Sequence, residues 1–158
     1  MVERLVDVEE VASSILAPPT PINFMTNFSK LYEKALNVSA KRQLSEDSSC
    51  GGVGAVLLTA SGKIFTGICL DCPCGIGFCA EHSAVVEMLK SGESEIAEIV
   101  AVLSDGKILP PCGRCRELLM QISPENKNTL VHLSENKSKK LSELLPESYA
   151  DFSINENH

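Results

Sequence analysis

The chain has 158 residues, 44% of them hydrophobic, and a formal net charge of -7. This acidic balance gives no general attraction for a phosphate backbone or an anionic membrane surface, so we expect no nucleic acid and no membrane as partner, but a small neutral or cationic molecule. No stretch approaches the roughly 20 apolar residues of a membrane span, and residues 1–10 lack a signal-peptide pattern, which predicts a cytoplasmic protein.

The length predicts one compact domain at residues 23–158, preceded by an extension and linker at residues 1–22. Within the extension, apolar residues at helical spacing run from Leu5 to Ile15, and a proline cluster ends the pattern by Pro21. A second helix is predicted from Asn27, as its N-cap, to Lys41.

The elements that follow alternate between strands and helices. Two segments rich in strand formers flank residues 61–63 and predict a hairpin, and a loop rich in Cys, Pro and Gly follows at residues 70–78. This alternation predicts an α/β layered fold. In chain order, we predict strands at 53–60 and 64–69, a helix at 79–90, a strand at 96–104, a helix at 112–122, a strand at 129–134 and a short helix at 140–145.

Seven cysteines are present, and their clustering favours metal or thiol chemistry in a reducing compartment over a secreted disulfide framework. Cys112 and Cys115 open a predicted helix, on which both thiols are within reach of one ion. Taken alone, this pair also suits a redox dithiol, half of a structural zinc site, or two buried apolar cysteines.

Cys79 opens another predicted helix, and helix N-termini stabilise thiolates. We therefore predict that Cys79, Cys112 and Cys115 bind zinc (Zn2+). Three protein ligands leave one coordination position for water, which is the pattern of a catalytic site, whereas a structural site usually has four. Glu81 lies two residues beyond Cys79 and is predicted to face the open position and move protons.

These residues form two motifs, Cys79-Ala80-Glu81 and Pro111-Cys112-Gly113-Arg114-Cys115, that match the signature of zinc nucleobase deaminases. Over about residues 53–149 the chain resembles the cytidine deaminase family, and within it the blasticidin S deaminases, also through Ile64-Phe65-Thr66-Gly67 and Leu144-Leu145-Pro146. The resemblance implies a three-layer fold with a central mixed sheet of about five strands flanked by helices, and a homotetramer. It implies hydrolysis of the exocyclic amine of a cytosine nucleoside, or of an analogue such as blasticidin S, with Glu81 relaying protons and ammonia released.

The resemblance also implies substrate contacts, which we assign to Asp71, Ala80 and Tyr149. Where the family has an Asn and a Glu that hold the ribose, this chain has Cys69-Leu70-Asp71, so Asp71 replaces the Glu. Tyr149 matches a family aromatic residue that reaches a neighbouring subunit's pocket; packing of Tyr149 against a surface helix is the alternative. His82 stands where many members have an Arg, so Arg114, Arg116 and the helix ends are expected to offset the thiolate charge.

Cys50, Cys69, Cys72 and Cys74 are expected to be loop and core residues, with a second thiol cluster near the pocket as the alternative.

Three other functions remain open. In the first, the chain deaminates another aminated heterocycle. In the second, it is a non-catalytic binding module stabilised by zinc. In the third, it is an editing deaminase that acts on RNA or DNA. The net charge of -7, the lack of Trp and the presence of only two Tyr disfavour the last of these.

Overall fold

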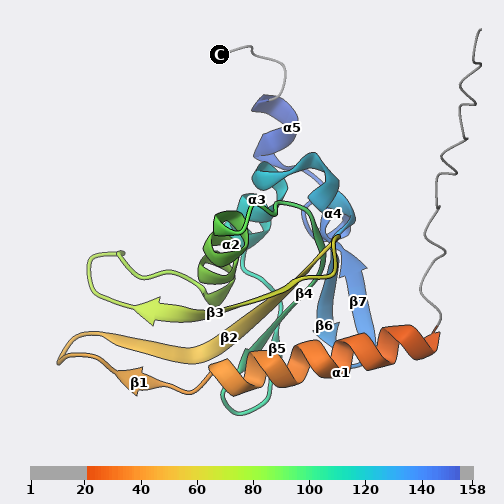
Figure 1. Ribbon diagram of the computed structural model, residues 1–158. Coiled ribbons are helices and arrows are strands. Elements are labelled where there is room, and N and C mark those ends of the chain that lie inside the picture. The colour runs from red at the N-terminus through yellow and green to blue at the C-terminus, as the bar shows by residue number, and fades with distance from the viewer. Residues whose placement is uncertain (1–20, 154–158) are drawn as a thin grey trace, which may run out of the picture.

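A mixed β-sheet with helices on both faces forms the fold (Figure 1). The computed structural model describes residues 21–153, so the helix predicted within residues 5–15 lies outside the described residues. The sheet has seven strands in the order β1-β2-β4-β6-β7, with β3 paired to β2 and β5 paired to β4. The elements are α1 (Pro21–Val38), β1 (Arg42–Gln43), β2 (Ser49–Thr59), β3 (Ile64–Asp71), α2 (Ala80–Lys90), β4 (Ile96–Leu103), β5 (Ile108–Leu109), α3 (Gly113–Ile122), the 3₁₀ helix η1 (Pro124–Asn128), β6 (Leu130–Ser134), β7 (Lys137–Lys140), α4 (Leu141–Leu144) and α5 (Tyr149–Ser153).

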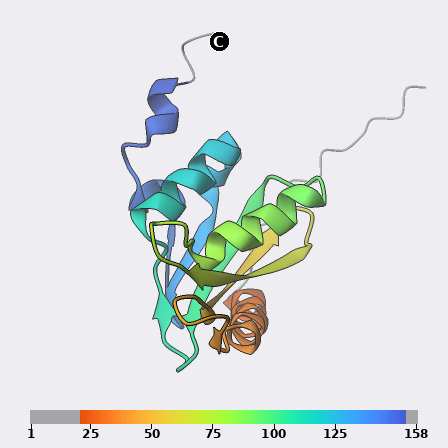
Figure 2. The same cartoon turned by 90° about the vertical axis from the view of Figure 1, so that its left-hand side faces the viewer.

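Side chains that alternate along the central strands form two cores, one on each face of the sheet. On one face, Val56 of β2 and Val100 of β4 pack in a cluster with Leu31 of α1. On the other face, the neighbouring Leu57 and Ile99 pack in a cluster that includes residues of α2 and α3. Helix α1 therefore covers one face and helices α2 and α3 cover the other (Figure 2), which confirms the predicted three-layer α/β fold. None of the helices described has the length and apolar character needed to cross a bilayer.

Helix α1 corrects the boundaries predicted for the first helix of the domain. It begins at Pro21, and Asn27 lies inside the helix rather than at its N-cap. Proline is favoured at the first helical position, where its missing N–H costs no hydrogen bond. The helix ends at Val38 instead of Lys41, because the Ser39 hydroxyl donates to the carbonyl of Leu36 at 2.7 Å and the Ser39 carbonyl accepts from the Gly52 N–H at 2.7 Å, which directs the chain toward β2.

The sheet has more strands than the five predicted. The four strand segments taken from the sequence correspond to β2, β3, β4 and β6, whereas β1, β5 and β7 were not predicted. Strands β1 and β5 have two residues each, too few to show a period of two. The strand β7 has the sequence Lys-Ser-Lys-Lys, which lacks apolar residues and forms by antiparallel pairing with β6.

Strand β3 and helix α2 lie unusually close together, which fixes the position where α2 begins. A side chain at Gly67 would collide with the backbone of Ala80 and Ala84, so only glycine permits this approach. Two side chains of α2 also accept hydrogen bonds from backbone N–H groups of β3: Ser83 from Ile68 at 2.8 Å and Glu87 from Thr66 at 3.0 Å. These bonds give partners to the Thr66 and Ile68 N–H groups at the outer edge of the sheet, and they hold α2 against it.

Candidate metal centre

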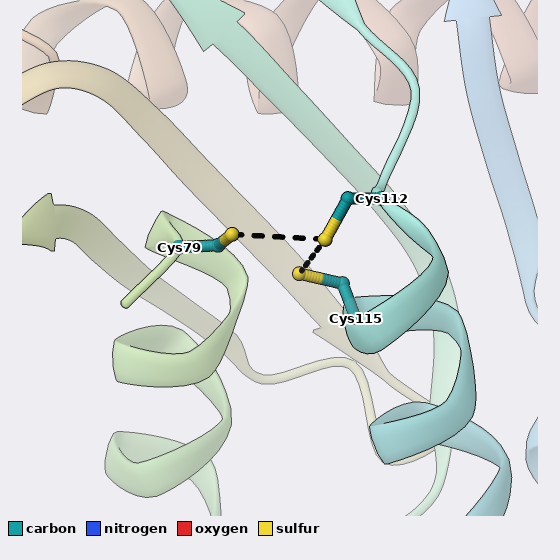
Figure 3. A group of neighbouring side chains, drawn as sticks. All are labelled: Cys79, Cys112 and Cys115. Atoms are coloured by element: carbon teal, nitrogen blue, oxygen red, sulfur yellow. Dashed lines mark hydrogen bonds between the residues drawn. The ribbon is translucent and has the colours of Figure 1, made fainter. Parts of the chain in front are cut away.

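Two helix starts bring three thiols together (Figure 3). Cys79 is the N-cap of α2 and Cys112 is the N-cap of α3, both with extended backbone, and neither thiol caps its own helix. Cys115 lies in the first turn of α3 and is fully buried. The sulfur atoms of Cys79 and Cys112 are 3.7 Å apart, and those of Cys112 and Cys115 are 3.4 Å apart.

The spacing of these thiols fits a zinc ion. Tetrahedral zinc with Zn–S bonds of about 2.3 Å separates its sulfur ligands by about 3.8 Å. All three sulfur atoms lie within 4.8 Å of one another, and among the residues described they are the one group of three or more metal-binding side chains this close. The structure therefore brings the three predicted ligands around a common point, where they would hold one zinc ion between them.

The three thiols differ in how readily they lose a proton. Burial raises the pKa of Cys79, and burial together with the Glu81 charge raises the pKa of Cys115. Burial also opposes ionisation of Cys112, but hydrogen bonds from the backbone and thiol of Cys115 and from the Cys79 thiol lower its pKa overall. Because a bound metal takes the place of the thiol protons, metal binding at this site releases protons.

Glu81 lies beside the thiols with its carboxyl group almost fully enclosed. The residue is 5% exposed, and burial raises the pKa of its carboxyl group. Together with Cys79 and Cys112 it lines a single cavity. A buried carboxyl group whose pKa is raised can hold a proton at a pH where an exposed one has lost it, so Glu81 is suited to proton transfer in this cavity.

The cavity has a volume of about 530 Å³, which is in the range of small-molecule sites. Asp71 and Ala80, two predicted substrate contacts, line it beside the metal ligands. Tyr149, the third, is not among the lining residues of this single chain: it lies on α5 and is 68% exposed. The structure thus brings Asp71 and Ala80, but not Tyr149, to the site.

Sequence reasoning missed several residues of the cavity wall. The side chains of Val53, Phe78 and Leu109 line the cavity and give it an apolar surface. Phe78 directly precedes the predicted ligand Cys79, so its place next to the motif was an available signal. Val53 and Leu109 come from strands β2 and β5 and carry no such signal, because only the folded sheet brings them near the thiols.

The remaining cysteines and His82 supply neither a second metal site nor a positive charge. The Cys69 thiol donates to the Gly51 carbonyl at 2.7 Å, and among the described residues Cys69, Cys50, Cys72 and Cys74 belong to no metal-binding group. Burial, followed by the charge of Arg114, lowers the pKa of His82, so its imidazole is neutral at pH 7. Arg114 lines the cavity together with Cys79 and Cys112.

The fold is a mixed sheet covered by helices, and three thiols and a buried carboxyl group lie at the starts of two of these helices. These features define an α/β metal-binding protein. A sequence model described as the cytidine and deoxycytidylate deaminase zinc-binding region matches residues 25–131, and the chain belongs to this family. It is 28% identical over 109 residues to a cytidine deaminase of Halalkalibacterium halodurans, covering 66% of this chain and 81% of the relative.

Solved structures show the same similarity. The cytidine deaminase of Mycobacterium tuberculosis superposes with a TM-score of 0.66 at 25% identity, over 78% of this chain and 97% of that chain. The cytidine deaminase of Burkholderia pseudomallei superposes with a TM-score of 0.62 at 27% identity, over 77% of this chain and 98% of that chain. The family and the three thiols together confirm zinc as the cofactor.

Proposed function

We propose that this protein is a zinc-dependent hydrolase that deaminates the cytosine ring of a nucleoside or a nucleoside analogue and releases ammonia. The observation that carries this proposal is the shared cavity, in which the Glu81 carboxyl group faces the same space as two of the three metal-binding cysteines. The names of the relatives, which are cytidine deaminases, support the choice of a cytosine nucleoside.

Glu81 accounts for the proton movements that this reaction needs. Hydrolysis replaces the exocyclic amine with the oxygen of water, and the two protons of that water end on the ring nitrogen and on the departing ammonia. A single buried carboxyl group can accept each proton and pass it on. Zinc, when bound, supplies a Lewis acid that activates water near neutral pH.

Asp71 is the residue to which we assign recognition of the part of the substrate beyond the ring. Its carboxylate is at the exposed end of β3, lines the cavity, and lies 3.4 Å from the Ser49 hydroxyl. It can accept hydrogen bonds from sugar hydroxyls or from a cationic group of an analogue such as blasticidin S. The thiol of Cys69 already donates a hydrogen bond to the Gly51 carbonyl, so it does not take the place of the family's ribose-binding Asn.

The test is ammonia release by the zinc-loaded protein from cytidine, deoxycytidine, deoxycytidylate, blasticidin S and purine nucleosides that carry an amine. We expect turnover of a cytosine compound, and we expect Asp71→Asn to raise KM for it by about 10-fold or more through loss of charged hydrogen bonds. Glu33→Gln on the exposed side of α1 is the matched control and should leave KM unchanged. Zinc-loaded protein that releases no ammonia from any of these compounds would instead support the non-catalytic module.

The proposal includes a homotetramer in a reducing compartment such as the cytoplasm. Val86 and Leu89 on α2 and Tyr149 on α5 are 65%, 45% and 68% exposed, and such apolar surface is suited to contact between subunits. All seven cysteines are free, as the metal ligands must be. Light scattering should give the mass of four 17.0 kDa chains; the mass of one chain would contradict the tetramer.

A further inference from the structure

The residue before each helix-start cysteine has its carbonyl held by a hydrogen bond. Before Cys79, Phe78 exchanges two backbone hydrogen bonds with Leu70 of β3, each 2.9 Å long. Before Cys112, the carbonyl of Pro111 accepts a hydrogen bond of 2.9 Å from Nε of Arg116. One ligand is therefore fixed by a strand-like bridge and the other by a side chain.

The sequence explains why a side chain, and not a backbone bridge, holds the segment before Cys112. Pro110 and Pro111 have no backbone N–H, so this segment cannot form the reciprocal bridge that Phe78 forms. Their carbonyls remain as acceptors, and the guanidinium group of Arg116, one turn into α3, supplies the missing donor.

The same guanidinium group also holds a second part of the chain. Its Nη1 donates to the Leu144 carbonyl at 2.9 Å, at the last residue of α4. Leu141, the first residue of α4, is fully buried in the same core cluster as Leu119 of α3. Arg116 thus connects the segment before Cys112 to an element that is anchored in the core.

We propose that Arg116 is a positioning residue for the metal ligand Cys112, acting through the Pro111 carbonyl; this inference rests on the zinc site of the proposed function. Arg116 does not line the cavity, so it contacts no substrate there. Its planar guanidinium group reaches two carbonyls at once, which an ammonium group on a flexible chain does not reproduce. This role differs from the charge compensation expected of Arg116 from the sequence, which a lysine would preserve.

The experiment compares zinc affinity in Arg116→Lys and Arg116→Gln, measured by competition with a chromophoric chelator. We expect both variants to bind zinc about 10–100-fold more weakly, the range typical when a partner of a metal ligand is lost. The control is Arg42→Gln in the exposed strand β1, which removes the same charge and should keep the parent affinity. The rate of zinc release from the loaded proteins is measured in parallel, so that a variant unstable without zinc still gives a result.

Each outcome separates the possible roles of Arg116. Parent affinity in Arg116→Lys with a loss in Arg116→Gln would show that only charge matters and would overturn the positioning role. Parent affinity in both variants would overturn it as well. A parent protein that binds zinc but deaminates nothing would refute the proposed function and leave the positioning role standing, whereas a parent that binds no zinc would refute both.

Discussion

Asn126 joins three segments of the chain through one fully buried side chain. Its amide nitrogen donates to the carbonyls of Ser94 at 3.1 Å and Leu119 at 2.9 Å, and its amide oxygen accepts from the N–H of Ile96 at 2.8 Å. These bonds tie the end of α3 to the start of β4. The α3 helix, which carries two metal ligands, therefore depends on Asn126 for its position against the sheet.

We predict that Asn126→Ala lowers the free energy of unfolding by about 2 kcal/mol, because it leaves the Leu119 carbonyl and the Ile96 N–H buried without their Asn126 partner. Urea denaturation of the zinc-free protein measures this loss. Asn128→Ala, in the same 3₁₀ helix but exposed, is the matched control and should change stability little. A loss at Asn126 no larger than that at Asn128 would show that water replaces these bonds.

Whether a residue's role could be predicted depended on whether the residue stands in a short sequence motif. Cys79, Glu81, Cys112 and Cys115 stand in two short motifs, and their spacing alone placed them at helix starts. Asn126 bonds to residues near position 95, and Arg116 bonds to Leu144. No local pattern marks such contacts, since only the packing of α3 and α4 against the sheet creates them.

Helix α5 is attached to α3 through the Glu117 carboxylate. The Ser148 hydroxyl donates to it at 3.1 Å, and the backbone N–H groups of Tyr149 and Ala150 donate at 3.2 and 3.3 Å. Gln121 donates to the same carboxylate at 2.8 Å. The hydrogen bond from Gln121, and then those from α5, lower the pKa of Glu117.

This lowered pKa predicts how the attachment of α5 depends on pH. The folded state favours the ionised carboxylate, so its contribution is complete above the ordinary Glu pKa of about 4.3 and is lost as pH falls through the lower folded-state pKa. We expect hydrogen exchange at the Tyr149 and Ala150 amides, corrected for intrinsic rates, to lose protection below about pH 4. In Glu117→Gln, protection should be weaker and independent of pH; a pH dependence that persists in this variant would assign the effect to another group.

The helices next to the site were easier to predict than the sheet edges. Helices α2 and α3 begin one residue after the cysteines that were predicted to open them, because an N-cap residue with extended backbone precedes each. The start of α1 was predicted too late, since Pro21 was interpreted as part of a breaking cluster rather than as a first helical residue. Strand β7 forms only because β6 pairs with it, which the residues of β7 do not indicate.

In the folded chain, the cavity is assembled from both strands of the β2–β3 hairpin, from β4 and from two helix starts. Its wall includes Val53 of β2, Asp71 of β3, Ala101 of β4 and Arg114 of α3. No single segment forms this cavity, so the site exists only when the layers are packed. A zinc ion held by Cys79 from one helix start and by Cys112 and Cys115 from the other would link α2 to α3 and should stabilise the folded chain.

We propose that Glu81 moves protons at a zinc site without holding the metal. The most direct measurement is the rate of ammonia release by Glu81→Gln, with the zinc content determined on the same sample and the parent protein beside it. We predict that the variant keeps the parent zinc content and loses kcat by about 10²–10⁴-fold, the usual contribution of acid–base catalysis. A zinc-loaded Glu81→Gln protein that releases ammonia at the parent rate would show that Glu81 does not carry the proton transfer.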